Sequence, residues 1–435
     1  MFLGRKVIVL LLSGLCTAPA MAVESEFVKL LDILKANNSL SQKQYNSMMS
    51  AIDDQEGESD EAGVRVSTKG GVELSSYDGQ FGFELGGRLM IDATAYQQDK
   101  VALGNGTELR RARLEVEGQM YSSWGYELGV DFAGGHADIK DAYIENLGNF
   151  DSSIKIGQFK EPFSLEELTS SRYITFMERA LPNEFAPGRH IGIGQSHLGE
   201  RWTLAYGLFG EAFDDEGGQL DEGWGVTGRF TYAPWQEDRR ALHLGLAVSQ
   251  RSPDDDNVVK FNSRPESHIT DIKYLDTGDI TDVDHVSLVG LEAALVLGSV
   301  SFQAEAINAQ VARNAGLDSL EFSGWYVYGS WFLTGESRIY KHKKGSFGRI
   351  KPTSEDGAWE LALRMSSLDL NDLDITGGEA DQMTIGVNWY ANPRVRFMLN
   401  YVTVDNDLDA DGDGTPVLTG DDDPTIIQLR AQIDF

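Results

Sequence analysis

Positively charged side chains gather in one short segment of an otherwise acidic chain. The sequence holds 37 Lys and Arg against 68 Asp and Glu, which gives a formal net charge of −31 at pH 7. Segment 334–353, TGESRIYKHKKGSFGRIKPT, nevertheless carries four lysines: Lys341, Lys343, Lys344 and Lys351. Ammonium groups can replace part of the hydration shell of a passing anion. The segment is therefore predicted to bind anions, with a solvated basic patch as the alternative.

Arginines recur on the polar side of segments in which apolar and polar residues alternate. There are seven of them: Arg88, Arg111, Arg113, Arg229, Arg364, Arg396 and Arg430. A guanidinium pairs well with oxyanions and stays charged, so a row of them could pass an anion from one to the next. The same arginines could instead hold neighbouring segments together by pairing with carboxylates: Glu84, Glu115, Glu117, Glu360 and Asp434. The sequence leaves both interpretations open.

Metal-binding and catalytic patterns are weak. Asp409, Asp411 and Asp413 stand at alternate positions, as at the start of a calcium-binding loop. The twelfth position of that pattern is Gly420 rather than Glu, so an acidic surface loop without a specific calcium site is the simpler interpretation. The seven His form no ligand cluster, and no G-x-S-x-G motif occurs. No metal, no cofactor, no nucleic-acid partner and no enzymatic activity are expected.

The last eleven residues, TIIQLRAQIDF, indicate which elements carry these side chains. Ile427, Leu429 and Ile433 stand at alternate positions, with polar residues between them. A strand places alternate side chains on opposite faces, so this segment predicts a strand with one apolar and one polar face. The chain ends on Phe435, and an aromatic terminus on such a strand resembles the recognition signal of outer-membrane barrels.

The alternation recurs along most of the chain and predicts sixteen strands. Charges on so many polar faces cannot be buried in a dry sandwich without a large cost, whereas a barrel keeps them hydrated in its lumen and turns its apolar face to lipid. The expected fold is all-β: a 16-stranded antiparallel transmembrane β-barrel with a short N-terminal periplasmic helical segment. The strands are expected to begin near Phe81, Glu108, Trp124, Ile139, Ser153, His190, Arg201, Gly223, Ala241, His285, Ser299, Glu321, Ala358, Gln382, Arg394 and Thr425.

Two connections depart from the pattern of short turns at one end of a barrel and longer loops at the other. Segment 159–189 carries apolar residues that a solvated loop does not need, among them Phe163, Leu168 and Phe176. Strand parity places segment 334–353 on the periplasmic side, where its 20 residues exceed a plain turn. Both segments are predicted to fold into the lumen and to narrow it.

Composition divides the chain into four parts. Residues 1–22 combine a basic start, an apolar run and a small-residue cleavage site, as in a secretory signal peptide. Residues 23–56 have apolar residues at helical spacing and could form a coiled-coil trimer tether or a small helical hairpin. Residues 57–80 are an acidic linker and the approach to the barrel, which spans 81–435. The only cysteine, Cys16, lies in the signal segment, so no disulfide is expected in the exported chain.

Five segments together resemble the phosphate-selective porin O and P family. They are GGRLMIDATAY, ELRRARLEVEG, KDAYIEN, GQFKEPFSLEELTSSRYITFMERALPNEFAPGR and FLTGESRIYKHKKGSFGRIKP. The resemblance implies a sixteen-stranded, usually trimeric channel, constricted by its third loop and by a periplasmic turn folded inward. It also implies that Ser170, Ser171 and Arg179 contact the anion. The phosphate-selective members have a lysine three places before the first serine, where this chain has Glu167.

The expected function is passive diffusion through a bacterial outer membrane, reached by signal-peptide export through the periplasm. The channel is expected to prefer phosphate or related small oxyanions. Glu167 motivates an alternative, a general or carboxylate-solute porin with little phosphate selectivity, and an enzymatic or adhesive barrel is the third possibility. The expected partners are small anionic solutes, outer-membrane lipid and lipopolysaccharide, and further copies of the chain in a homotrimer.

Overall fold

The computed structural model describes residues 35, 42–43, 45–46, 63–68, 71–148, 151–213, 221–406 and 422–435. Three predictions concern regions outside these residues: the signal peptide (1–22), most of the helical segment (23–56), and the candidate metal ligands Asp409, Asp411 and Asp413. They remain predictions. The chain divides into two compact units, one of Met1–Arg65 with Ser76–Asp78 and one of Val66–Ser75 with Gly79–Phe435. The second unit contains the barrel.

Sixteen strands form the barrel. Two shorter strands, β1 (Val64–Ser67) and β2 (Val72–Ser76), come before it in the chain, and β2 pairs with the first barrel strand. The barrel strands are β3 Gly82–Gln97, β4 Gly106–Met120, β5 Trp124–Asp131, β6 Asp138–Asn146, β7 Ser152–Lys160, β8 Arg189–Leu198, β9 Trp202–Phe209, β10 Trp224–Glu237, β11 Arg240–Ser252, β14 Val283–Leu297, β15 Val300–Arg313, β16 Leu320–Phe332, β19 Ala358–Asp372, β20 Ile375–Asn392, β21 Val395–Asn406 and β22 Thr425–Asp434.

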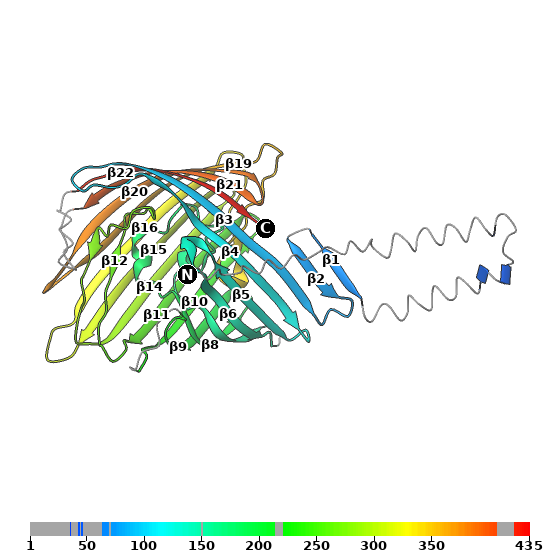
Figure 1. Cartoon of the computed structure of the whole chain (residues 1–435), viewed down its shortest axis with the longest axis horizontal. Helices are drawn as coiled ribbons and strands as arrows, with labels where there is room; N and C mark the ends of the chain where they lie inside the picture. Colours follow the sequence, from blue (N-terminus) through cyan, green and yellow to red (C-terminus); the bar gives the residue numbers. More distant parts are fainter. Residues whose placement is uncertain are drawn as a thin grey trace, which may run out of the picture. The chain divides into compact units, whose positions relative to one another are not determined.

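The barrel closes because its last strand pairs with its first. β22 runs antiparallel to β3, from Thr425 opposite Gln97 to Asp434 opposite Arg88. Figure 1 shows the two strands side by side, as red and light-blue arrows. Closure gives each barrel strand a hydrogen-bonded neighbour on both sides, which a sheet in lipid requires. The predicted sixteen-stranded antiparallel barrel is confirmed.

Side chains alternate across the wall as the sequence predicts. On β22, Leu429 exposes 53% of its surface and the neighbouring Arg430 exposes 2%. The exposed set is apolar on one strand after another, and the buried set is largely polar or charged. The apolar face therefore points out toward lipid, and the arginines singled out above lie on the lumen side.

One predicted strand start is clearly wrong. β20 begins at Ile375 rather than near Gln382, because β19 and β20 are joined by a tight turn instead of a loop. The intervening sequence, ITGGEAD, is polar and holds two glycines, which is typical of a loop. In the structure Gly378 has a φ of +91°, which glycine adopts readily, and it lies where the pairing shifts register near Asp369. Such a bulge lets the ladder continue through an unfavourable sequence.

Strand length varies around the barrel. The five consecutive strands β5 to β9 have 8, 9, 9, 10 and 8 residues. The other strands run from 12 to 18 residues, apart from β22 with 10. The five strands β5–β9 are called the short-strand wall below.

The largest apolar cluster lies inside the barrel. It joins side chains of two loops to the inner face of β14–β16 and β19, and its members include Phe163, Leu181, Phe185, Phe261, Leu275, Ile280, Leu288, Ile307, Phe322 and Leu368. The prediction of a water-filled lumen therefore needs a correction: one side of the lumen is a packed apolar core. The sequence prediction missed this core because most strands carry charged residues on their inner face, whereas β14–β16 and β19 carry several apolar ones there.

From residue 63 onward, the helices that the structure describes are few and short. They are η1 (Ala133–Gly135), α3 (Leu165–Leu168), η2 (Leu181–Phe185) and η3 (His342–Lys344). None of the described helices is long and apolar enough to cross a membrane.

Candidate solute channel and its constriction

The third loop, residues 161–188 between β7 and β8, lies inside the barrel and is held by the wall. Arg88 donates to the hydroxyl of Ser171 at 2.7 Å and to that of Ser170 at 3.3 Å. Arg396 donates to the carbonyl of Ile174 at 2.7 Å, and Arg430 donates to that of Met177. Asn388 donates to the carbonyl of Thr175 at 2.8 Å. Wall side chains thus satisfy loop carbonyls that have no strand partner.

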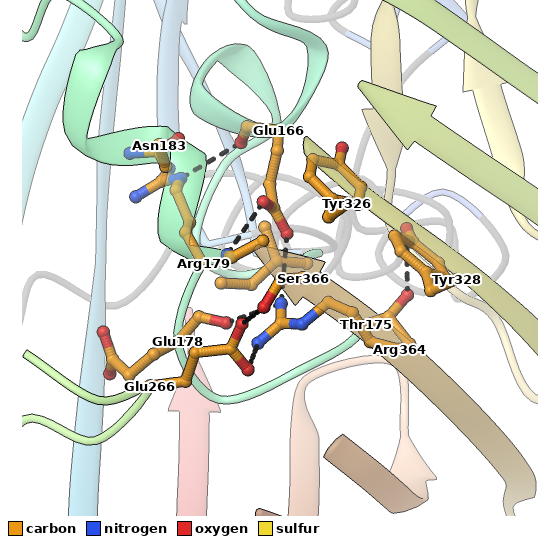
Figure 2. A network of polar contacts seen from close by, with 12 residues as sticks. Glu166, Thr175, Glu178, Arg179, Asn183, Glu266, Tyr326, Tyr328, Arg364 and Ser366 are labelled. Carbon is orange, nitrogen blue, oxygen red and sulfur yellow. Dashed lines mark hydrogen bonds and ion pairs between the residues drawn. The ribbon is translucent and has the colours of Figure 1, made fainter. Parts of the chain in front are cut away.

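A buried network around Arg364 links the third loop to a second loop. Figure 2 shows the Arg364 guanidinium between the carboxylates of Glu166 and Glu266. It also donates to the carbonyl of Glu178 at 3.0 Å, and Ser366 donates to Glu266 at 2.6 Å. Arg364 exposes 1% of its surface. A charge this buried is tolerated only when it is paired and hydrogen-bonded.

Glu266 belongs to a loop that sequence analysis did not place in the lumen. The 253–282 loop connects β11 and β14 and contains two short strands, β12 (Asn262–Ser263) and β13 (Leu275–Asp276). Phe261 of this loop packs edge-on against Phe185 of the third loop, with ring centroids 5.4 Å apart. The acidic residues at its start, Asp254, Asp255 and Asp256, are typical of a solvated loop. Its apolar residues, such as Phe261 and Ile280, were the signal that could have revealed the inward fold.

Most lumen arginines pair with carboxylates. The ion pairs are Arg88 with Glu115, Arg113 with Asp131 at 2.7 Å, Arg229 with Glu292 at 2.6 Å, Arg364 with Glu266, and Arg430 with Asp92 at 2.6 Å. Of the five carboxylates that the sequence suggested as partners, Glu115 alone forms an ion pair with one of these seven arginines in the described part of the chain. Asp434 pairs with Arg349 instead. Glu360 accepts a hydrogen bond from Asn388 at 2.9 Å. These contacts favour a bracing role for five of the seven.

Arg111 and Arg396 differ from the other five. Arg111 is buried and contacts the sulfur of Met90 at 3.5 Å. Arg396 binds neutral acceptors, the carbonyl of Ile174 and the amide oxygen of Gln432 at 2.9 Å. Within the described part of the chain, neither has a carboxylate within 4.0 Å. Their positive charge is therefore less neutralised locally than that of the others.

A β-bulge adds a further arginine to the lumen. The pairing of β3 with β4 shifts between Met90 and Ile91, so that Arg110 is the extra residue. Its guanidinium forms an ion pair at 2.9 Å with Glu178 of the third loop. Bulges often re-aim a side chain in this way. Strict alternation would place Arg110 on the apolar face with Ala112 and Leu114, and the sequence pattern alone does not locate a bulge.

Glu167, at which this chain differs from the phosphate-selective members, forms ion pairs with two cationic side chains. Lys160 at the end of β7 forms an ion pair with its carboxylate, and Arg179 contacts the same carboxylate at 3.2 Å. Burial would raise the pKa of Glu167, but Arg179 and Lys160 lower it to about 2. The acid therefore stays ionised at neutral pH and carries two cations beside it.

Arg179 also holds the shape of the loop. It donates to the carbonyls of Glu166 at 3.1 Å, Glu167 at 3.1 Å and Thr169 at 3.2 Å. These carbonyls belong to the end of α3, where a helix has no partners of its own. Ser164 accepts from the amide of Glu167 at 3.1 Å and caps the other end. The contacts of Arg179 are thus with the loop itself.

Substituting Glu167→Gln is expected to raise the anion preference of the channel, because one negative charge is lost while Lys160 and Arg179 remain. The folded carboxyl has a lower pKa than the unfolded one, so it stabilises the fold above about pH 4.5 and this contribution is lost as the pH falls toward 2. The variant should lack that acid-dependent loss. Zero-current potentials and acid unfolding of both proteins test this, with Glu355→Gln, an exposed acid between β16 and β19, as the control. Equal potentials in the variant and the parent would contradict the expectation.

The inward turn, residues 333–357 between β16 and β19, reaches the lumen from the other end. It forms a small hairpin of β17 (Ile339–Lys341), η3 and β18 (Ser346–Gly348). Tyr340 is 2.7 Å from His243 on β11, Arg229 donates to the carbonyl of Gly345 at 2.9 Å, and Arg349 donates to Tyr173 of the third loop at 3.1 Å. The turn thus contacts both the wall and the third loop.

A basic cavity lies between the inward turn, the third loop and the short-strand wall. Its volume is about 490 Å³. The cationic side chains that line it are Lys155, Lys160, Arg229, Lys343 and Lys344, against the acids Glu145 and Asp151. Lys160 and Arg229 are paired with Glu167 and Glu292, and Lys155 is 3.8 Å from Glu145. Lys343 and Lys344 have no hydrogen bond or ion pair to any residue that the structure describes.

The two remaining lysines of the turn do not line this cavity. Lys341 lies over the ring of Tyr173, with its ammonium 5.7 Å from the centroid. Burial lowers the pKa of Lys341, and so does the positive charge of Lys344 and Arg349 nearby. Lys351 is exposed. The structure therefore brings Lys343 and Lys344 into one space, with Lys341 close enough to Lys344 to feel its charge.

Metal ligation finds no support within the described ranges. They contain no group of three or more His, Cys, Asp or Glu side chains arranged to hold a metal ion. Asp409, Asp411 and Asp413 fall in the gap between 406 and 422.

A closed sixteen-stranded barrel whose lumen is narrowed by inward-folded segments defines a diffusion channel of the outer membrane. The chain belongs to the phosphate-selective porin O and P family, whose model matches residues 83–435. The predicted family is therefore confirmed. A porin is a passive channel and not an enzyme, so the enzymatic alternative is set aside.

Individual relatives agree with this assignment. Porin O of Pseudomonas aeruginosa is 29% identical over 405 residues, which cover 82% of this chain and 91% of that protein. An anion-selective porin from Comamonas acidovorans has a similar structure, with a TM-score of 0.53 at 15% identity, covering 82% of this chain and 100% of the other. OmpT of Vibrio cholerae in its trimer form has a TM-score of 0.51 at 12% identity, covering 82% and 99%. At these low identities the structures support the fold only.

Proposed function

We propose that this porin prefers small oxyanions, phosphate among them, over cations. The observation that supports the proposal most is the basic cavity, where Lys343 and Lys344 lie beside the constriction and pair with no carboxylate among the residues that the structure describes. In a narrow space, few water molecules separate such charges from a passing ion, so each acts at an effective dielectric below that of bulk water. An anion entering the cavity would exchange part of its hydration shell for ammonium donors. No bond is made or broken.

Glu167 weighs less against this proposal than its sequence position suggested. Its carboxylate is engaged by Lys160 and Arg179, so the local sum of the three charges is positive. Phosphate accepts hydrogen bonds at several oxygens, and lysine is a common phosphate ligand. The preference is therefore assigned to the lysines of the inward turn, because they carry positive charge. The third-loop serines are neutral, and Arg88, which donates to both of their hydroxyls, forms an ion pair with Glu115.

A second candidate, a general or carboxylate-solute porin, is favoured by an acidic cavity. This space of about 370 Å³ is lined by Glu73, Glu84, Glu117 and Glu145. In the pairing of β2, β3 and β4, Glu84 lies opposite both Glu73 and Glu117. Carboxylates placed side by side would repel an anion that passes them and would weaken anion preference. The basic cavity would increase the share of the current carried by chloride, and the acidic cavity would decrease it.

Competition between anions in a planar bilayer separates the two candidates. The purified full chain is expected to conduct chloride, and millimolar phosphate is expected to block that current at lower concentration than acetate or succinate does. Phosphate and the carboxylates blocking equally, or not at all, would favour the general porin and overturn the phosphate preference.

Assembly and export are also proposals. We propose a homotrimer, exported with residues 1–22 as its signal peptide and surrounded by outer-membrane lipid and lipopolysaccharide. The trimer form of OmpT shows that this fold is compatible with trimers. Outward-facing acids near the loop end, such as Asp381 opposite Asp405, suit divalent-bridged lipopolysaccharide. Residues 23–56 are proposed as a tether or a separate hairpin, and residues 57–80, which contain β1 and β2, as the linker and approach to the barrel.

Deleting residues 23–61 is expected to leave unit conductance and insertion unchanged, because the side chains that form the constriction all lie in the barrel. Bilayer recording of the deleted chain tests this, and a changed unit conductance would contradict it. Light scattering in mild detergent then reports on the tether: loss of trimers would assign the helical segment that role, and intact trimers would show that the barrel walls suffice.

A further inference from the structure

Two hydrogen bonds tie the inward turn to the barrel strands β10 and β11, one on either side of its lysines. Tyr340, in β17, has its hydroxyl 2.7 Å from Nδ1 of His243 on β11. Gly345, which follows η3, accepts on its carbonyl from Arg229 of β10 at 2.9 Å. The segment between these two contacts, residues 341–344 (KHKK), contains the lysines that line the basic cavity. The position of these lysines therefore depends on both contacts.

One carboxylate, that of Glu292 on β14, supports both contacts. It accepts two hydrogen bonds from Arg229, at 2.8 Å and 2.6 Å, and it lies 2.9 Å from Nε2 of His243. A guanidinium held by two parallel bonds has a fixed direction, so Glu292 aims Arg229 at the carbonyl of Gly345. In a neutral imidazole, the tautomer that donates from Nε2 to Glu292 leaves Nδ1 to accept from Tyr340.

The carboxylate of Glu292 fits its place closely. Its side chain exposes 1% of its surface, and those of Arg229 and His243 expose 4% and 1%. Gly245 lies opposite Glu292 in the pairing of β11 with β14, and a β-carbon on Gly245 would lie 2.4 Å from Oε2 of Glu292. The glycine therefore leaves the space that the carboxylate fills. A charge buried this deeply is tolerated because it is paired.

We propose that Glu292 is the positioning residue for Lys343 and Lys344, an inference that rests on the proposed anion preference. By its charge alone, a carboxylate next to the cavity would weaken that preference. Its contacts act in the opposite sense, because they hold two ammonium groups where a passing ion meets them. His342, in the same segment, also contacts the carbonyl of Gly199 at 2.9 Å. Loss of the support from Glu292 is therefore expected to displace the lysines without releasing the whole turn.

Substituting Glu292→Gln separates the two effects by their sign. If charge alone mattered, loss of the acid would raise the anion preference, as is expected for Glu167→Gln. If Glu292 holds the lysines in place, the permeability of chloride relative to potassium falls several-fold, because a neutral amide holds Arg229 less firmly. Zero-current potentials of the purified full chain in planar bilayers give this ratio for both variants. A rise of the ratio in Glu292→Gln would overturn the assignment.

Gly245→Ala tests the same role without changing any charge. The added methyl group would collide with the Glu292 carboxylate and move it away from Arg229 and His243, so the chloride preference should fall here too. Gly228→Ala is the matched control on the neighbouring strand β10, because a β-carbon there would lie 3.7 Å or more from the surrounding atoms. Equal zero-current potentials for the two alanine variants would contradict a positioning role.

A spin label reports the position of the turn independently of ion selectivity. In a Cys16→Ser background, which has no other cysteine, a nitroxide at Lys343→Cys is expected to become more mobile when Glu292→Gln or Gly245→Ala is added, and not with Gly228→Ala. A cation-selective parent whose label is still mobilised would overturn the proposed anion preference and leave the anchoring of the turn standing. An anion-selective parent whose potential and label mobility are unchanged by both variants would overturn this inference alone.

Discussion

Replacing Lys341, Lys343 and Lys344 by Gln is expected to lower the anion preference of the channel strongly. Gln roughly keeps the bulk of lysine and removes its charge. The ammonium groups of Lys343 and Lys344 line the basic cavity. Burial lowers the pKa of Lys341, and the nearby charge of Lys344 lowers it further. Their attraction acts in a confined space where screening is weak. The zero-current potential in a salt gradient should therefore move toward that of a cation-selective pore.

Salt dependence and a matched control sharpen this prediction. The difference between the triple variant and the parent should be larger at low ionic strength, where the remaining exposed charges are least screened. Lys351→Gln is the control, because Lys351 lies on the same turn but is exposed and does not line the basic cavity. An unchanged potential in the triple variant, or an equal shift from Lys351→Gln alone, would remove the lysines of the inward turn from the selectivity mechanism.

Arg364→Met is expected to destabilise the barrel by about 3–5 kcal/mol, the usual cost of leaving a buried charge without its partner. The carboxylates of Glu266 and Glu166 would lose the guanidinium between them (Figure 2). Both the third loop and the 253–282 loop contact this arginine, so both would be held less firmly. Single-channel recordings should therefore show a larger and noisier conductance, and heat-dependent gel mobility should report earlier unfolding.

A double variant distinguishes a lost ion pair from a simple packing defect. Arg364→Met combined with Glu266→Met removes both charges and should recover part of the stability that the single change loses. Arg313→Gln is a matched control, because its partner Asp374 has a side chain that is 60% exposed and exposed pairs contribute little. If the single Arg364 variant were as stable as the Arg313 variant, the loops would not depend on this network.

The strands of the barrel wall could be predicted from sequence because the alternation of apolar and polar residues is a property of each strand by itself. Alternation along one strand, as in TIIQLRAQIDF, reports which face meets lipid, and the repetition of that pattern sets the number of strands. Phe163 and Phe176, apolar residues in a loop, were enough to predict that the third loop folds inward. The lysines of the inward turn were found in the same way, by their contrast with an acidic chain.

What the sequence could not provide was the pairing of charges across the lumen. Arg364 pairs with Glu266, which lies 98 positions away, and Arg430 pairs with Asp92 across the closure of the barrel. Such partners depend on strand register and on the path of two loops, and neither is encoded in local spacing. The inward position of Arg110 depends on a bulge, and bulges are set by long-range pairing. The sequence therefore located the cations of the lumen but not which of them stay unpaired.

The zero-current potential of the parent channel tests the central claim most directly. The purified full chain is inserted into a planar bilayer between two potassium chloride solutions of different concentration, and the voltage at which the current vanishes is read. If Lys343 and Lys344 of the basic cavity set the selectivity, that voltage has the sign given by chloride as the main carrier. A voltage with the sign for potassium would show that the acidic cavity prevails, and the assignment of anion preference would be wrong.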